Sequence, residues 1–232
     1  MRQLYPVPVD PVDPADVYGE WPDAGPRPGL RLNMVASADG ATTVAGTSGG
    51  LGGPADRALF VLLRSLADVV LVAAGTVRAE RYGHSSVPVA VVSRSCRFDW
   101  DAPFFSAQKA RPIVVTVADA PEPLRARAAE VTEVVLAGER DVDLARALDE
   151  LGAMGFRSVL AEGGPSLNAQ LAAAGLIDEL CLTLAPSLVG GHAKRILDGP
   201  ALPTPVELRL CSVCEQDGFL FLRWRRGAAT PR

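Results

Sequence analysis

One short stretch of the sequence combines residue types that suit the binding of an anionic ligand. An apolar run at 158–161 predicts a buried strand, and a helical pattern begins at Ser166. Between them, Gly163 and Gly164 leave backbone N–H groups uncovered at a helix N-terminus, where the helix dipole favours negative charge. Glu162 closes the strand at the sheet edge where α/β proteins bind ligands. The stretch predicts a pyrophosphate-binding turn, and an ordinary strand-to-helix turn is the alternative.

Two other predicted strands end in residues of the same kind. Ala74-Gly75-Thr76 follows one apolar run and offers a second helix N-terminus, and Ser93-Arg94 follows the next run. Arginine binds phosphate through two parallel N–H groups, so this pair suits a terminal phosphate such as the 2′-phosphate of NADP. No GxGxxG occurs in the chain. The three junctions together predict a dinucleotide site in a fold other than the Rossmann fold.

The apolar periodicity predicts the elements that position these residues. Continuous apolar runs, typical of strands buried on both faces, alternate with helical patterns. Strands are predicted at 30–36, 69–73, 88–92, 112–117, 132–137 and 158–161, and helices at 54–66, 76–81, 122–129, 143–153 and 166–174. Three strands follow at 177–184, 206–214 and 219–224, with Asp217-Gly218 as a hairpin turn. We expect an α/β domain with a mostly parallel central sheet flanked by helices and a C-terminal antiparallel hairpin.

Two stretches lack this periodicity. Residues 1–29 hold seven prolines and predict an extended arm, which Tyr5, Tyr18 and Trp21 can pin to the body or to a partner subunit; a partly mobile tail fits equally. Residues 37–53 hold six glycines and predict an active-site lid, with a flexible surface connection as the alternative. The chain is accordingly divided into an arm, 1–29, and one domain, 30–226.

Composition excludes several classes of function. The net charge is −4, both signs are interspersed, and 48% of the 232 residues are hydrophobic, which favours a globular protein without affinity for nucleic acid or anionic membranes. No basic and apolar leader and no run near ~18 apolar residues occurs, so we expect a cytoplasmic protein. With only His84 and His192, and with Cys211 and Cys214 on opposite faces of a predicted strand, we expect no metal site and no histidine triad.

Five ordered motifs carry a resemblance to a known family. They are Ala36-Ser37-Ala38-Asp39-Gly40, Leu63-Arg64-Ser65 with the apolar run after Asp68, Gly75-Thr76-Val77, Glu162-Gly163-Gly164, and Gly175-Leu176-Ile177-Asp178-Glu179-Leu180 with Ala185-Pro186. The sequence resembles, over residues 30–224, the reductase domain of the bifunctional riboflavin-pathway deaminase/reductase, which has the dihydrofolate-reductase fold. The resemblance implies NADPH as the hydride donor and a homodimer. It also implies reduction of the ribosyl chain of 5-amino-6-(5-phosphoribosylamino)uracil to a ribityl chain.

The resemblance also assigns roles to residues of this chain. The cofactor residues that it implies, together with those of the three junctions, are Ala36, Gly50, Gly75, Thr76, Ser93, Arg94, Gly163, Gly164, Pro165, Ser166, Leu167 and Asn168. It places Glu80 near the nicotinamide ring as a catalytic residue. Ser48, Arg64 and Glu162 then face the substrate, with Arg64 as a phosphate partner and Glu162 as a hydrogen-bond acceptor. The alternative for Arg64 is that it only complements the dipole at a helix end.

The sequence departs from the family pattern at two motifs. Asp39-Gly40 is followed by Ala41 where the family has Lys or Arg, and Ala79-Glu80-Arg81-Tyr82 replaces an Ala-Asp-Asp-Pro run. Both changes alter polar contacts to the substrate, so the sequence does not decide whether the riboflavin-pathway pyrimidine is the substrate. The zinc motifs of nucleobase deaminases, His-x-Glu with Pro-Cys-x-x-Cys, do not occur either. We therefore expect a free-standing reductase without deaminase activity.

Asp56 supports an alternative substrate. It lies in a Pro-Ala-Asp context at the start of a predicted helix, where dihydrofolate reductases carry the carboxylate that binds the pterin ring. Such a carboxylate accepts two N–H bonds from a 2-aminopyrimidine edge and favours the protonated ring, which makes the adjacent C=N more reactive toward hydride. An aspartate that only complements the helix dipole is the alternative. Dihydrofolate reduction is thus the second hypothesis, and a noncatalytic NADP-binding module is the third.

Overall fold

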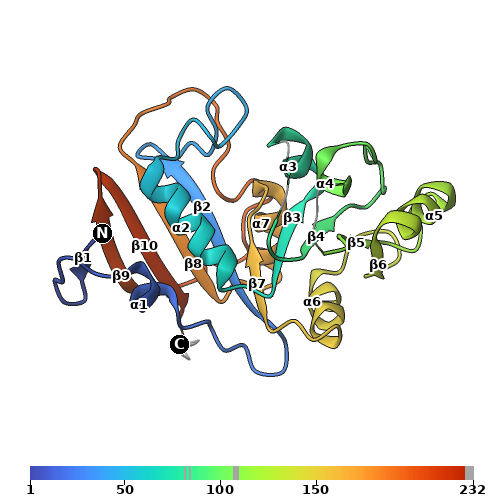
Figure 1. The fold of residues 1–232 in the computed structure, drawn as a ribbon, viewed down its shortest axis with the longest axis horizontal. Helices are drawn as coiled ribbons and strands as arrows, with labels where there is room; N and C mark the ends of the chain where they lie inside the picture. Colours follow the sequence, from blue (N-terminus) through green and yellow to red (C-terminus); the bar gives the residue numbers. More distant parts are fainter. Residues whose placement is uncertain (81, 84, 107–109, 228–232) are drawn as a thin grey trace.

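The computed structural model describes residues 1–80, 82–83, 85–106 and 110–227. Its framework is a ten-stranded sheet in the order β1-β9-β10-β8-β2-β7-β3-β4-β5-β6 (Figure 1). The strands from β8 to β6 pair in parallel, whereas β10, β9 and β1 pair antiparallel at the other end. The predicted α/β class, with a mostly parallel sheet and an antiparallel C-terminal hairpin, is confirmed.

Helices alternate with the strands along the chain. The strands are β1 (Arg2–Tyr5), β2 (Gly29–Ser37), β3 (Val69–Ala73), β4 (Val89–Val92), β5 (Ile113–Thr116), β6 (Glu133–Leu136), β7 (Ser158–Ala161), β8 (Glu179–Ala185), β9 (Leu208–Gln216) and β10 (Phe219–Arg226). The helices are α1 (Pro14–Tyr18), α2 (Pro54–Ser65), α3 (Ala74–Ala79), α4 (Pro103–Ser106), α5 (Glu122–Val131), α6 (Leu144–Ala153) and α7 (Pro165–Ala173). No helix within the described ranges is long and apolar enough to cross a membrane.

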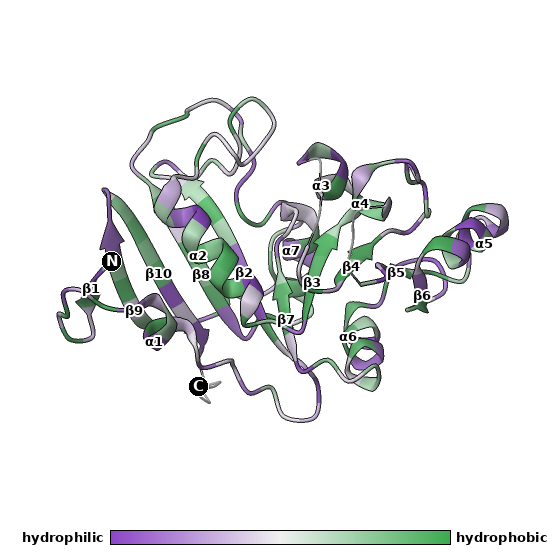
Figure 2. Ribbon diagram, in the orientation of Figure 1, coloured by the Kyte–Doolittle hydropathy of each residue, from purple (hydrophilic) through white to green (hydrophobic). Residues whose placement is uncertain are grey.

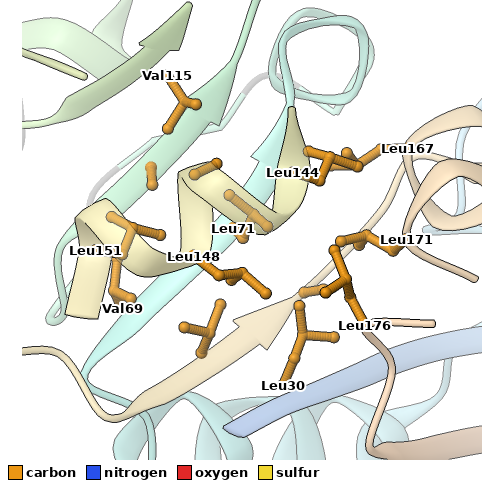
Figure 3. Close-up of a cluster of buried hydrophobic side chains, with 14 of the residues drawn as sticks. Leu30, Val69, Leu71, Val115, Leu144, Leu148, Leu151, Leu167, Leu171 and Leu176 are labelled. Atoms are coloured by element: carbon orange, nitrogen blue, oxygen red, sulfur yellow. The ribbon is translucent and has the colours of Figure 1, made fainter. Parts of the chain in front are cut away.

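The apolar run of β3 shows why the sheet lies between two layers. Side chains alternate along a strand, so Val69 and Leu71 pack into one cluster while Val70 and Val72 pack into the other. Leucines of α6 and α7 fill the first cluster (Figure 3), and α2 lies over the second. Figure 2 shows the strands of the sheet as predominantly hydrophobic ribbons. Burial on both faces keeps the strand ends, and the loops that follow them, in fixed positions.

The N-terminal segment belongs to the sheet and its covering layer. β1 pairs with β9, and Tyr18 of α1 is fully buried against α2 and its neighbours. The Trp21 indole N–H donates to the Gly29 carbonyl at 2.9 Å, whereas Tyr5 is exposed. The sequence predicted an extended arm here because β1 has only four residues and prolines follow it closely, so no strand periodicity is visible in the sequence.

Local patterns account for most of the remaining elements. The strands at 69–73 and 158–161 begin and end as predicted, and the other predicted elements are found with small shifts at their ends. Asp217 and Gly218 both adopt positive φ in the hairpin turn, which is the geometry that this turn needs. The sequence pattern did not predict β1, α1 and α4, which are all shorter than six residues. Cys211 and Cys214 of β9 are free thiols.

Candidate active site

A cavity of about 1090 Å³ opens at the carboxyl ends of the parallel strands. The loop at 37–53, between β2 and α2, arches over this edge beside the segment that joins β8 to β9 (Figure 1). The predicted site residues that line the cavity are Ser48, Asp56, Arg64, Gly75, Thr76, Glu80, Glu162, Gly164, Pro165, Ser166 and Leu167. The structure therefore brings together most residues that the sequence singled out, from four separate parts of the chain.

A buried ion pair forms one wall of the cavity. The Nε of Arg64, near the end of α2, donates to Oε1 of Glu162 at 2.7 Å, and its Nη2 donates to Oε2 at 2.7 Å. Burial opposes the guanidinium charge, but the hydrogen bonds and charge of Glu162 outweigh it and raise the pKa of Arg64. The sequence assigned both side chains separately to the substrate. The structure pairs them with each other and leaves the Nη1 group of Arg64 outside that pair.

Two aromatic rings hold this ion pair. The Arg64 guanidinium lies 4.3 Å from the centre of the Phe60 ring and 5.2 Å from that of Tyr82. The Tyr82 hydroxyl donates a hydrogen bond to Oε2 of Glu162. Burial raises the pKa of Tyr82 well above its usual value, and the charge of Glu162 adds to this effect. The phenol therefore keeps its proton at neutral pH and acts as a donor.

Glu80 connects α3 to the glycine-rich loop. It follows α3 directly, and its Oε1 accepts the backbone N–H of Ser48 at 2.8 Å. Within the loop, a Cβ atom at Gly50 would meet Val44 at 3.0 Å, and one at Gly52 would meet the Asp56 carboxylate at 2.6 Å. The loop thus lies close to the cavity wall because glycine allows it, and a carboxylate holds its backbone there.

Asp56 presents a second carboxylate to the cavity. It lies in the first turn of α2, after Gly53 and Pro54 begin the helix. Burial raises the pKa of Asp56, and a hydrogen bond with the Thr183 side chain partly opposes this shift. A carboxylate beside a hydroxyl in a cavity wall suits the amino edge of a heterocyclic ring, which offers parallel N–H donors.

The start of α7 fits the phosphate groups of a dinucleotide. Its N-cap is Gly164, whose lack of a side chain leaves the first N–H groups of the helix without a side-chain cap. A Cβ atom at Gly164 would come within 2.7 Å of the Thr76 hydroxyl oxygen, while a Cβ atom at Gly75 would meet nothing within 4 Å. The turn and the start of α3 therefore adjoin each other with room for a backbone-bound anion.

Six predicted cofactor residues lie outside the cavity lining. Ala36, Gly50 and Gly163 are next in sequence to residues that line it. Asn168 is fully buried and donates to the Ile196 carbonyl at 2.9 Å, so it fixes the segment between β8 and β9. Ser93 and Arg94 lie at the end of β4. Arg94 forms a 2.9 Å ion pair with Asp141 and lines a separate hollow of about 350 Å³ with Arg140 and Asp119.

Asp39 of the Asp-Gly-Ala motif faces away from this lining. Its carboxylate accepts hydrogen bonds from the Ser37 hydroxyl at 2.5 Å and from the backbone of Val189 and Gly190 at 3.1 and 2.7 Å. The hydrogen bond from Ser37 is the largest of the effects that lower the pKa of Asp39 to about 2. Asp39 therefore anchors the turn after β8, and Ala41 beside it is buried.

Sequence reasoning missed several residues of the cavity. Tyr82 and Phe60 hold the ion pair, and Arg57 and Lys194 add positive charge to the lining. Lys194 pairs with Asp198 at 2.5 Å. Neither the spacing of these residues nor a motif sets them apart from surface residues, because their approach depends on how the loops fold. Arg81 and His84, which flank Tyr82 and Gly83, lie outside the described residues.

Comparison with known proteins identifies the family. The model of the RibD C-terminal domain family matches residues 28–219. The chain belongs to this family. A protein of Methanothermobacter thermautotrophicus named 2,5-diamino-6-ribosylamino-4(3H)-pyrimidinone 5′-phosphate reductase is 32% identical over 186 residues, which are 76% of this chain and 86% of that protein. An Aquifex aeolicus protein of the same name is 29% identical over 70% of this chain and 78% of its own length.

Solved structures agree with the family assignment. A pyrimidine reductase-like protein from Corynebacterium diphtheriae superposes with a TM-score of 0.79 and 26% identity, over 93% of this chain and 98% of that one. A dihydrofolate reductase from Enterococcus faecalis shares the fold, with a TM-score of 0.52 and 12% identity over 86% of this chain and 97% of that one. The predicted resemblance and the dihydrofolate-reductase-like fold are confirmed, and the family is one of reductases.

Proposed function

We propose that the chain is an NADPH-dependent reductase of a riboflavin-pathway pyrimidine. The substrate is a 5-phosphoribosylamino pyrimidine, either 5-amino-6-(5-phosphoribosylamino)uracil or the 2,5-diamino-pyrimidinone for which the relatives are named. The product carries a ribityl chain. The observation that carries the proposal is the cavity itself, where the Arg64–Glu162 pair lies in the same lining as the glycine turn at the start of α7.

The cavity residues divide between cofactor and substrate. NADPH would supply the hydride, with its diphosphate held at Gly164–Ser166 and Thr76 and its nicotinamide near Glu80. Arg64, Glu162 and Ser48 would bind the ribosyl chain, and the positive side chains of Arg57 and Lys194 supplement Arg64 toward the 5′-phosphate. The loop at 37–53, held by Glu80, excludes water from the reacting carbon. The homodimer, the cytoplasmic location and the cofactor roles of Ser93 and Arg94 stay predictions.

Dihydrofolate reduction is the second candidate, and the Asp56 carboxylate favours it. Asp56 lines the cavity beside Thr183, and burial raises the pKa of its carboxyl group. That arrangement recognises the 2-amino edge of a pteridine. It also recognises the 2-amino group of the diamino-pyrimidinone, which a uracil lacks. The three substrates therefore differ in how strongly they require Asp56.

One experiment separates these candidates. NADPH oxidation is measured with the uracil, the diamino-pyrimidinone and dihydrofolate side by side, for the wild type, Arg64→Ala and Asp56→Asn. We expect turnover of a phosphoribosylamino pyrimidine, with Arg64→Ala raising the KM of that substrate at least tenfold while the KM of NADPH changes less than twofold. Turnover of dihydrofolate alone, abolished by Asp56→Asn, would establish the second candidate. NADPH binding without oxidation of any substrate would favour the noncatalytic module.

A further inference from the structure

Tyr82 is a cavity residue that the family pattern does not predict. It stands last in the Ala79-Glu80-Arg81-Tyr82 run, where the family has a proline that carries no hydroxyl. Its ring lies beside the Arg64 guanidinium, and its hydroxyl donates to Glu162, so Tyr82 contacts both members of the ion pair in the cavity wall. The residue thus adds a polar group at a position where the resemblance implies none.

The hydrogen bonds around Glu162 define what Tyr82 does there. A carboxylate offers about two acceptor positions on each oxygen. Among the described residues, Oε2 accepts from Nη2 of Arg64 and from the Tyr82 hydroxyl, whereas Oε1 accepts from Nε of Arg64. One acceptor position is left on Oε1. Arg64 in turn spends two of its five N–H donors on Glu162.

We propose that Tyr82 is a positioning residue for Glu162. By filling the second position of Oε2, its hydroxyl fixes the carboxylate so that the open position of Oε1 and the remaining donors of Arg64 serve a ligand in the cavity together. A group that donates and accepts at the same time fits such a pair, and the hydroxyls of a ribosyl chain are of this kind. The inference rests on the proposed function, because that chain carries the carbon to be reduced.

Without the Tyr82 hydroxyl, the carboxylate has a free position on each oxygen. Two arrangements of the ligand hydroxyl then become available, and only one of them places the reacting carbon correctly. A misplacement of about 1 Å lowers the rate of the chemical step up to about a hundredfold without removing a binding group. The ion pair itself stays, since both of its hydrogen bonds come from Arg64.

The test removes only the hydroxyl. Tyr82→Phe should lower kcat about tenfold or more while the KM of NADPH changes less than twofold, and exposed Tyr5→Phe serves as the matched control. In a Glu162→Gln background the same change should have little further effect, because residues that act through one another are not additive. Equal fold losses in both backgrounds, or an unchanged kcat in Tyr82→Phe with an unchanged melting temperature, would overturn the proposal.

A second readout does not depend on activity. The chain has three tyrosines, so the difference in alkaline absorbance between the wild type and Tyr82→Phe isolates the Tyr82 phenol. Tyr82 should ionise well above pH 10 in the wild type and at a lower pH in Glu162→Gln, measured against the double variant. Ionisation at the same pH in both backgrounds contradicts the contact. If the wild type turns over no pyrimidine but shows this shift, the proposed function is wrong, while the contact between Tyr82 and Glu162 stands.

Discussion

The structure buries two clusters of arginine and glutamate, one in the cavity wall and one beneath the N-terminal segment. In the first, Glu162 accepts from Arg64 and Tyr82. In the second, Glu179 lies between Arg31, Arg223 and Arg225, at 2.5, 2.9 and 2.9 Å. Both glutamates are nearly inaccessible to solvent, with side-chain exposures of 3% and 0%.

The clusters differ in what their remaining donors bind. Arg31 donates to the carbonyls of Tyr18 and Glu20 at 3.0 and 2.7 Å and stacks on Trp21 at 4.2 Å. Arg223 donates to the carbonyls of Val17 and Glu20. Arg31 and Arg223 thus use donors of the second cluster to hold the backbone at residues 17–20. In the first cluster, Arg64 is 15% exposed and keeps donors beyond the pair with Glu162.

This difference separates a structural role from a functional one. A buried charge is costly unless its hydrogen bonds are satisfied. The second cluster satisfies most of them within the chain, although Nε of Arg223 and Nη2 of Arg225 have no hydrogen-bond partner among the described residues. The first cluster instead lies in the cavity lining, where a ligand can bind the donors that Arg64 does not use for Glu162. Residue type alone would rank the two equally, so the environment of the unused donors is the deciding feature.

The largest effect is expected from the sealed cluster. Glu179→Gln leaves Arg31 and Arg223 buried without their counter-charge, so the free energy of unfolding should fall by about 3–5 kcal/mol. Urea denaturation monitored by circular dichroism measures it. The exposed pair of Arg2 and Glu215, at 3.2 Å, provides the control, because Glu215→Gln should cost less than about 1 kcal/mol. Similar losses for both variants would remove the distinction between sealed and exposed pairs.

A matched pair of lysine substitutions sharpens the comparison. Arg31→Lys loses the fork that reaches two backbone carbonyls, and we expect a stability loss of about 2–3 kcal/mol. Arg64→Lys loses one of two bonds to Glu162 and should cost about 1 kcal/mol, but it should lower kcat/KM for the pyrimidine about 10- to 100-fold. Denaturation and turnover of the same preparations check both. If Arg64→Lys lost stability without losing activity, the cavity cluster would be structural as well.

The sequence predicted what depends on local pattern. The apolar run at Val69–Ala73 predicts a strand buried on both faces, and Gly164 before Pro165 indicates the start of a helix. In both cases a few neighbouring residues determine the structure. The strand β1 was missed since its existence depends on pairing with β9 near the other end of the chain. Candidate residues at strand ends were found for the same local reason.

Pairings between distant residues escaped prediction. Arg64 and Glu162 are 98 positions apart, so the sequence named both without showing that they bind each other. Tyr82 was passed over because its role comes from a contact 80 positions away. Asp39, by contrast, lies in the family motif yet holds the turn after β8. Motifs located the site, and only the fold shows which donors are left for a ligand.

Asp56 offers the smallest but sharpest test, because it is a half-buried carboxylate for which the described residues supply no ion-pair partner. The pKa of Asp56 is raised in the folded state. Below the unfolded pKa of about 3.9 the carboxyl group is protonated in both states, so its burial costs no stability. As the pH rises through the folded pKa, burial of the charged carboxylate destabilises the fold. Asp56→Asn should therefore raise the free energy of unfolding at pH 7, and the gain should vanish toward pH 4. Urea titrations across this range measure it. Asp16→Asn, at an exposed first turn, should show no such gain, and a pH-independent difference for Asp56→Asn would contradict the burial argument.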